Sequence, residues 1–378
     1  MALNNVNISI EQGGLNRSLP NEDHVAAILF DQSAPASWGS DKAKHFRSIA
    51  QVEQAGILAT DPLLGLVHYT ASEFFRMSGG ELYIVFNINT TEDFLAATAG
   101  RVRMIASYGV LGDVSDWQGI CQELAAANAP AVFIGGLPTA TDVFDSSELI
   151  DLHNMGSSYV SVVIAGDGSG QGAALASSLG LNCIPNVGAV LGALSSAQVH
   201  ISAAWVERFN FNTEGEMASI KLADGSNLDD ALISDLDDLN DRGYLFFRRF
   251  PGLSGYYLND TFSAVDLASD YAYIENNRVV QKAYRLLYAT YVPKLNSPIQ
   301  VDANTGKLSP EIVKYFEALG DKALREKMTA EGELSGHKVE IDPDQNILSN
   351  SKLEINVKLV PVGVARNIDI SLGFAVSL

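Results

Sequence analysis

The chain closes with KLEINVKLVPVGVARNIDISLGFAVSL (residues 352–378), in which apolar side chains alternate with polar or small ones. A period of two is typical of a strand with one buried face, and Pro361 and Gly363 divide the stretch into two predicted strands. Because an unpaired strand edge promotes aggregation, the second strand needs a partner in its own subunit or in a neighbouring one. Its apolar positions are Ile368, Ile370, Leu372, Phe374, Val376 and Leu378.

The chain also opens with an alternating segment, in which polar residues separate Val6, Ile8 and Ile10. A loop rich in Gly, Asn and Pro, residues 13–21, follows this segment. We therefore predict a strand-like arm tethered to the body of the protein, rather than the first element of a core.

Composition excludes several classes of protein. With 378 residues, of which 47% are hydrophobic and 19% charged, the chain is long enough for two or more folded domains and is not disordered. No apolar run approaches the roughly 20 residues of a membrane-spanning helix, and the first residues do not form a secretory signal. A formal net charge of −20 repels the phosphate backbone, so we expect no nucleic-acid partner.

Two local features of the composition have structural interpretations. Cys121 and Cys183 are too few for a disulfide framework and fit synthesis in a reducing cytoplasm. Asp229–Asp241, DDALISDLDDLND, is acidic at helical spacing. We interpret it as a solvated helix face, with a patch for a basic partner as the alternative.

Apolar strands alternate with helices from residue 24 to residue 165, which predicts an α/β fold with a largely parallel sheet covered on both faces. The predicted strands are Val25–Phe30, Glu81–Ile88, Val102–Ser107, Pro130–Gly135 and Tyr159–Ala165, and the predicted helices are Phe46–Ala59, Leu63–Met77, Ser115–Asn128 and Ser146–Met155.

The second half of the chain predicts helices and a hairpin. Its elements are a helix at Leu228–Arg242, strands at Tyr244–Phe250 and Tyr256–Asn259, and helices at Asp270–Tyr291 and Lys307–Lys327. Helical spacing places Lys314, Lys322 and Arg325 on one side of the last helix, away from Phe316 and Leu319. This basic stripe is either an ordinary solvated face or a contact for an acidic partner.

The segment YVSVVIAGDGSGQGAA, residues 159–174, contains the one motif that indicates chemistry. Gly168, Gly170 and Ala173 satisfy the GxGxxA form of a dinucleotide fingerprint. The acid expected roughly 20 residues later is missing, because the next carboxylate after Asp167 is that of Glu207. We interpret the loop as structural, and a cytosolic α/β nucleotide-binding enzyme using Gly166–Gly172 is the alternative.

No other constellation predicts an enzyme. The six histidines are scattered, without an HExxH pair or a nucleophile elbow. The carboxylate pairs Asp113–Asp116 and Asp342–Asp344 lack the further ligands of a calcium loop. We therefore expect no catalytic residue, no cofactor and no metal site.

From about Ile184 onward, the order of features resembles the contractile tail sheath proteins of bacteriophages and related injection systems. The resemblance rests on IPNVGAVLGALS (184–195), LNDRGYLFFRRFPGLSGYYLND (239–260), DYAYIENNRVVQKAYRLL (270–287) and the C-terminal strands. One departure is QVHISAAWVE (198–207), which stands where sheaths commonly carry an Asp and an Arg. The resemblance covers the last half of the chain and the N-terminal arm.

The resemblance implies an αβ outer domain and an inner α+β sheath core domain with extended N- and C-terminal β-strand arms. The corresponding ranges are an arm and linker at 1–22, the outer domain at 23–235, the core domain at 236–350, and the C-terminal strands and arm at 351–378.

The resemblance also implies a structural function without a cofactor. Sheath subunits stack as hexameric rings into a helical tube around an inner tail tube, and contraction drives that tube through a target membrane into which the sheath does not insert. Further partners are baseplate and tail terminator proteins. Such a subunit is made in the bacterial cytoplasm and assembled in the tail of a virion or phage-like particle. The implied contacts are inter-subunit arms at Val6, Ile8, Ile10, Ile368, Ile370, Leu372, Phe374 and Val376, and a tube-facing stripe at Lys314, Lys322 and Arg325.

Overall fold

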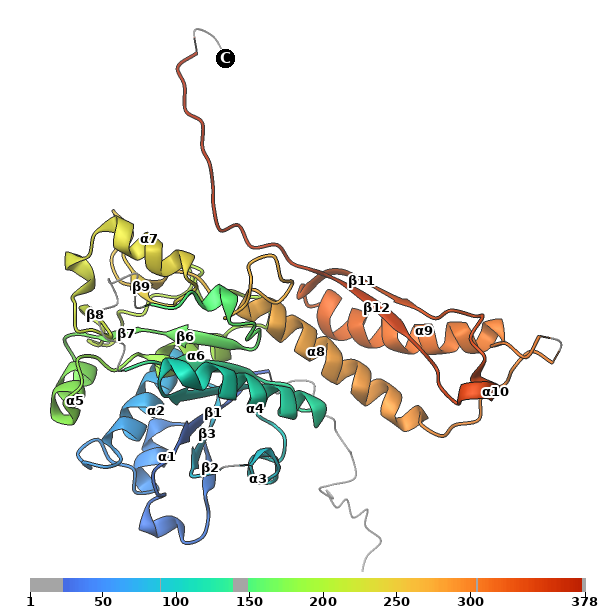
Figure 1. Cartoon of the computed structure of the whole chain (residues 1–378), viewed down its shortest axis with the longest axis horizontal. Helices are drawn as coiled ribbons and strands as arrows, with labels where there is room; N and C mark the ends of the chain where they lie inside the picture. The colour runs from blue at the N-terminus through green and yellow to red at the C-terminus, as the bar shows by residue number, and fades with distance from the viewer. Residues whose placement is uncertain (1–22, 89, 139–148, 304, 376–378) are drawn as a thin grey trace, which may run out of the picture.

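The computed structural model describes residues 23–88, 90–138, 149–303 and 305–375. They form a body built on a six-stranded sheet, an elongated lobe beside it, and an arm that projects from both (Figure 1). The fold is α/β, as predicted. Val6, Ile8, Ile10 and Val376 lie outside the described residues.

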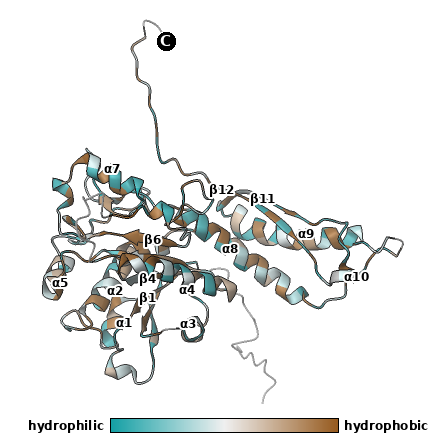
Figure 2. Cartoon of the chain, in the orientation of Figure 1, coloured by the Kyte–Doolittle hydropathy of each residue, from teal (hydrophilic) through white to brown (hydrophobic). Residues whose placement is uncertain are grey.

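The sheet of the body has the order β2-β3-β1-β4-β5-β6. All neighbouring strands are parallel except β2, which pairs antiparallel with β3 at the edge. The inner strands are almost fully buried, as expected for apolar strands covered on both faces (Figure 2). The strands are β1 (Val25–Phe30), β2 (Ala43–Phe46), β3 (Glu81–Phe86), β4 (Met104–Tyr108), β5 (Val132–Gly136) and β6 (Val160–Val163).

Helices cover both faces of this sheet. A Cβ added at Gly135 would lie 1.9 Å from Trp117 of α4, and one added at Gly136 would lie 2.8 Å from Val187 of α6. Successive strand residues point to opposite faces, so α4 and α6 lie on opposite sides of β5. Trp117 also stacks on Phe133, with ring centroids 5.0 Å apart. The helices of the body are α1 (Ile49–Gln54), α2 (Gly65–Met77), α3 (Thr91–Thr98), α4 (Val114–Ala126), α5 (Gln171–Leu179), α6 (Val187–Ser196) and α7 (Ile233–Asp241).

Close packing of α2 on α6 depends on small residues. Every residue of α6 from Val187 to Ser195 is buried, and Asn186 caps the helix by accepting from the Ala189 N–H. A Cβ at Gly188 would lie 2.3 Å from the Thr70 carbonyl oxygen, and one at Gly192 would lie 2.5 Å from the Phe74 carbonyl oxygen. The glycine- and alanine-rich segment therefore lets two backbones approach each other.

Two small antiparallel pairs complete the body. β7 (Ala165–Asp167) pairs with β8 (Ile220–Leu222), and β9 (Phe247–Arg248) pairs with β10 (Tyr257–Leu258). The second pair is the predicted hairpin. The hydrophobic cluster around the sheet includes residues as far along the chain as Ile274.

The lobe consists of α8 (Ile274–Tyr291), α9 (Pro310–Leu324), the short α10 (Ile347–Asn350) and a ribbon of two antiparallel strands, β11 (Leu334–Glu340) and β12 (Asn356–Pro361). One hydrophobic cluster of the lobe is separate from that of the body and includes Val279, Ala283 and Leu286 of α8. Lys282 of α8 pairs with Asp23 at 2.8 Å and with Glu333 at 2.7 Å. Lys282 therefore fixes both Asp23 and Glu333, the residue before β11, against α8.

Several predicted elements differ from the structure. The predicted helix at Leu228–Arg242 divides into a 3-10 turn at Leu228–Asp230 and helix α7. Phe46 ends an edge strand, and helix α1 spans only Ile49–Gln54, because Ala43–Phe46 pairs with β3. Within the described part of the predicted helix at 146–155, only Leu152–Asn154 forms a 3-10 turn, after an Asp151 cap. The predicted strand at Tyr159–Ala165 divides into β6 and β7, because the chain leaves the sheet after Val163 and pairs with β8.

Two glycines inside helices provide a matched test of the α2–α6 contact. We expect Gly192→Ala to destabilise the protein by about 1–3 kcal/mol, because the added methyl group overpacks the interface. Gly119 of α4 has nothing within 4 Å of an added Cβ, so Gly119→Ala should stabilise the protein by up to about 1 kcal/mol. Urea unfolding followed by circular dichroism measures both changes, and equal effects would contradict the packing argument.

Candidate functional site

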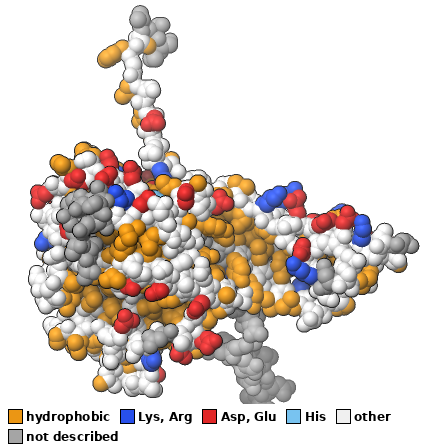
Figure 3. Space-filling view, in the orientation of Figure 1, with side chains coloured by type: hydrophobic (Ala, Val, Ile, Leu, Met, Phe, Trp, Pro, Cys, Tyr) orange, Lys and Arg blue, Asp and Glu red, His pale blue; other side chains and the backbone are white. Residues whose placement is uncertain are grey.

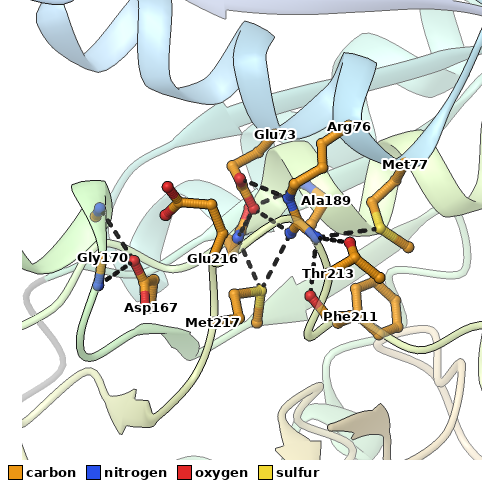
Figure 4. Close-up of polar contacts among 12 residues, drawn as sticks. Glu73, Arg76, Met77, Asp167, Gly170, Ala189, Phe211, Thr213, Glu216 and Met217 are labelled. Carbon is orange, nitrogen blue, oxygen red and sulfur yellow. Dashed lines mark hydrogen bonds and ion pairs between the residues drawn. The ribbon is translucent and has the colours of Figure 1, made fainter. Parts of the chain in front are cut away.

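The glycine-rich loop is filled by the side chains of its own chain. Asp167, at the end of β7, accepts hydrogen bonds from the backbone N–H groups of Ser169 at 3.0 Å, Gly170 at 2.8 Å and Gly172 at 3.3 Å. Figure 4 shows Asp167 beside Gly170. Glu216 accepts from the Gln171 N–H at 3.1 Å. These are the donors at the start of α5 that a dinucleotide pyrophosphate would require, and two carboxylates already occupy them.

The glycines of this loop have a packing role. A Cβ at Gly170 would lie 2.3 Å from a Glu216 carboxylate oxygen, and one at Gly172 would lie 2.5 Å from the Tyr69 hydroxyl oxygen. Burial raises the pKa of Glu216, and the neighbouring charges of Asp167 and Glu73 raise it further. Such a carboxylate cluster repels an anionic ligand, and the structure gives no support to a nucleotide site here.

A buried ion pair lies beside the loop. Glu73 accepts from Arg76 Nε at 2.8 Å and from Arg76 Nη2 at 2.5 Å, and it also accepts from the Asn186 amide (Figure 4). Both charged side chains are less than 5% exposed. Arg76 Nη1 donates to the Phe211 carbonyl oxygen at 2.8 Å and to the Thr213 hydroxyl at 2.6 Å.

This ion pair connects three segments that are distant in the sequence, namely α2, the cap of α6 and the loop at 211–217. Burial alone lowers the pKa of Arg76, but the hydrogen bonds and charge of Glu73 raise it overall. The guanidinium is therefore held as a cation with its partners in place. Its role is structural, and sequence patterns miss it because Asn186 and Thr213 lie more than 100 residues from α2.

Other groups that could take part in chemistry are dispersed or inert. Burial raises the pKa of the Cys183 thiol to about 12 and raises that of Cys121 as well. Across the described ranges, no group of three or more His, Cys, Asp or Glu side chains could hold a metal ion. In the same ranges, no helix has the length and apolar character needed to cross a bilayer.

The most unusual surface is the C-terminal arm, residues 367–375. It is extended and forms no strand with any described part of its own chain. Figure 3 shows its side chains standing clear of the body. The predicted alternation is present, but the predicted burial is not, because a single chain provides no partner for it. The apolar side chains are exposed by 77% at Ile368, 76% at Ile370, 94% at Leu372 and 111% at Phe374.

The two-stranded ribbon of the lobe has strand edges that could pair with an extended segment. Within the described chain, β11 and β12 pair only with each other, so each retains one open edge. Ile355, Val357 and Leu359, on or next to β12, are only partly buried against the cluster that α8 and α9 form. The hydrophobic cluster is therefore incompletely covered beside the open edge of β12.

The predicted basic stripe lies on the exposed side of α9 and of the turn that follows it. Lys314, Lys322 and Arg325 are all exposed, whereas Phe316 is buried. Arg325 pairs with Asp321, which also accepts from His337 Nε2 at 3.1 Å. The stripe thus carries one internal acid beside its three cations.

Comparisons with known proteins give two matching domain models and one similar fold. Residues 114–262 match the model of the DUF2586 N-terminal domain, and residues 270–378 match the model of the DUF2586 C-terminal domain. The chain is also similar to a chain in the cryo-EM structure of the anti-feeding prophage (AFP) baseplate, 6-fold symmetrised. That similarity has a TM-score of 0.62 at 14% identity and covers 99% of both chains, so it shows a shared fold. No curated protein matches the chain.

The comparisons do not name a sheath protein, and membership of the sheath family stays a prediction. The same holds for the roles of the arm residues and of the basic stripe.

We predict that the Glu73–Arg76 pair is essential for the body. Glu73→Ala leaves a buried guanidinium without its carboxylate and should cost about 3–5 kcal/mol of unfolding free energy. Glu354 pairs with Lys352 at 2.6 Å on the surface, with both side chains more than half exposed, so Glu354→Ala should leave the unfolding midpoint unchanged. Chemical denaturation of both variants measures the difference, and a Glu73→Ala protein of unchanged stability would refute the assignment.

Proposed function

We propose that this protein is a structural subunit of a phage-like contractile particle and that it assembles with copies of itself by strand exchange. One observation carries the proposal: the chain presents an extended arm with an alternating apolar face and, on its lobe, a two-stranded ribbon with open edges. An unpaired strand and an open edge are the two halves of β-augmentation.

The finer proposal is that the subunit belongs to a contractile tail sheath, in which hexameric rings stack around an inner tube and contraction drives the tube through a membrane. Two features support it. The segments that resemble sheath proteins form the elements expected of them, namely the buried helix α6, the β9–β10 hairpin and the long helix α8. The fold is also shared over its full length with a chain of a contractile injection system baseplate.

Strand exchange would satisfy groups that the single chain leaves open. Each residue of the arm that joins a neighbour's ribbon gives its backbone N–H and C=O a partner. Burial of the four apolar side chains of the arm contributes on the order of 1.5–3 kcal/mol each before the costs of association. Alternation then fixes register, because a slip of one residue would turn the apolar side chains to the solvent.

The acceptor that fits this strand best is the open edge of β12. The half-buried Ile355, Val357 and Leu359 lie there beside the cluster of the lobe. An added strand would bring a second apolar row to the same face and would close the cluster. The segment containing Val6, Ile8 and Ile10 is the candidate for the open edge of β11.

We further propose that the basic stripe of α9 faces the inner tube. Lys314, Lys322 and Arg325 form an exposed local group of cations in a chain whose formal net charge is −20. Complementary charge gives such a contact its specificity and association rate. The remaining partners under this proposal are the baseplate and tail terminator proteins, in a particle assembled after synthesis in a bacterial cytoplasm.

Negative-stain microscopy and analytical ultracentrifugation of the purified protein test strand exchange. We expect hollow cylinders from the full chain and monomers after deletion of Asp369–Leu378. Leu372→Asp should prevent assembly, because it places a charge on the apolar face, whereas Ser371→Asp changes the other face and should be tolerated. Cylinders from the truncated chain would contradict the proposal.

Charge reversal tests the tube contact separately. The triple variant Lys314→Glu, Lys322→Glu and Arg325→Glu should still form sheath-only cylinders but should lose co-assembly with the tube, as measured by cosedimentation. Lys327→Glu, an exposed cation outside the stripe, is the control and should co-assemble normally. Normal co-assembly of the triple variant would show that another surface meets the tube.

A further inference from the structure

The base of the arm is fixed to the body by one side chain. After β12 ends at Pro361, the chain passes through exposed residues 363–365 and reaches Arg366, whose Nε lies 3.0 Å from both carboxylate oxygens of Asp260. Nη2 donates to Glu275 at 2.5 Å. The guanidinium carbon lies 3.4 Å from the centroid of the Tyr273 ring.

The partners of Arg366, here called the socket, are Asp260, Tyr273 and Glu275. Asp260 follows β10, Tyr273 is the N-cap of α8 and Glu275 lies in its first turn. The socket is preorganised by the body, because the second oxygen of Glu275 accepts from the Thr261 hydroxyl at 2.6 Å. Two carboxylates and an aromatic face suit a planar guanidinium better than a lysine ammonium.

The socket needs a cation. The Glu275 side chain is 3% exposed and the Asp260 side chain is 13% exposed. Burial raises the pKa of Glu275, while the charge of Arg366 opposes that rise. Removing Arg366 would therefore leave a buried carboxylate with a poorer partner, so the arm and the body are coupled at this point.

We propose that Arg366 and its socket fix the point at which the C-terminal arm leaves the subunit, so that only the chain after Arg366 is available to a neighbour. This inference rests on the proposed strand exchange. Arg366 acts as a positioning residue, because its contacts are with the body of its own subunit.

The position of this point limits the assembly. The nine described residues of the arm, 367–375, extended at about 3.3 Å each, reach about 30 Å from the socket. Release of Arg366 would add residues 362–366 to the free segment and lengthen its reach by roughly 15 Å. It would also free the residue that fixes which side of the arm carries Ile368, Ile370, Leu372 and Phe374. The socket therefore sets both the spacing of neighbours and the register of pairing.

A pair of single-residue insertions tests the proposal in the full chain. One glycine inserted between Gly363 and Val364 lengthens the segment before the socket, and we expect cylinders as in the unmodified protein. One glycine inserted between Arg366 and Asn367 shifts every apolar side chain of the arm to the opposite face, and we expect loss of cylinders. Any other pattern, including equal behaviour of the two insertions, overturns the inference.

A second measurement does not depend on assembly. Cys121 and Cys183 are buried, so a spin label on Asn367→Cys reports selectively on the base of the arm. In the Leu372→Asp background, we expect Arg366→Ala to shorten the rotational correlation time of the label several-fold and Arg366→Lys to have a smaller effect. An unchanged spectrum in Arg366→Ala would overturn the inference.

The double variant Arg366→Ala with Glu275→Gln controls for unfolding. It removes the buried charge that Glu275 would otherwise carry without Arg366, and it should give the same mobile label. The two proposals also fail in different ways. If the unmodified chain forms no cylinders, the proposed strand exchange fails, whereas the label still tests whether Arg366 holds the base of the arm.

Discussion

Two buried charges of α8, those of Glu275 and Lys282, are paired with residues near the two ends of the described chain. Asp23, the first described residue, pairs with Lys282, and Arg366, just before the arm, pairs with Glu275. Removing one member of a buried ion pair strongly destabilises the protein, because the other charge is left buried without its partner. Helix α8 therefore does more than connect the body to the lobe. Its ion pairs fix the positions of Asp23 and Arg366. The position of Arg366 in turn sets the direction in which the arm leaves the subunit.

The body provides the rigidity that such an arrangement requires. The closely packed α2–α6 pair, the sheet covered on both faces and the Glu73–Arg76 pair bind distant segments into one unit. Asp167 and Glu216 close the glycine-rich loop from within. The features that resembled a nucleotide site are thus part of the packing.

Local sequence patterns predict the helices and strands whose burial follows from the spacing of their apolar residues. Strand β1 and the apolar face of α8 match their predicted positions, because apolar spacing alone determines which side is buried. Edge strand β2 and helix α3 were not predicted. The four residues of β2 carry a mixed pattern, and only pairing with β3 makes them a strand. The arm shows the opposite case, since its alternation is clear but no strand forms within the single chain.

The sequence predicts only those parts of the candidate site that lie within a single segment of the chain. The alternation of the arm and the basic stripe are visible in the sequence, whereas the socket is not. Arg366 lies 106 residues from Asp260 and 91 from Glu275, and no local spacing connects them. Pairing over such separations is decided by the fold as a whole. An arginine between two predicted strands gave no signal of its own.

One chain that carries both a projecting strand and an open ribbon has a polarity. Under the proposed strand exchange, each copy would donate its arm to one neighbour and receive an arm at its ribbon from another, so a row of copies would end with one unused arm and one unused ribbon. Such a row has no internal signal to stop growing. Its length must be measured by something outside the subunit, and a copy able to receive a strand but not to donate one would terminate growth at one end only.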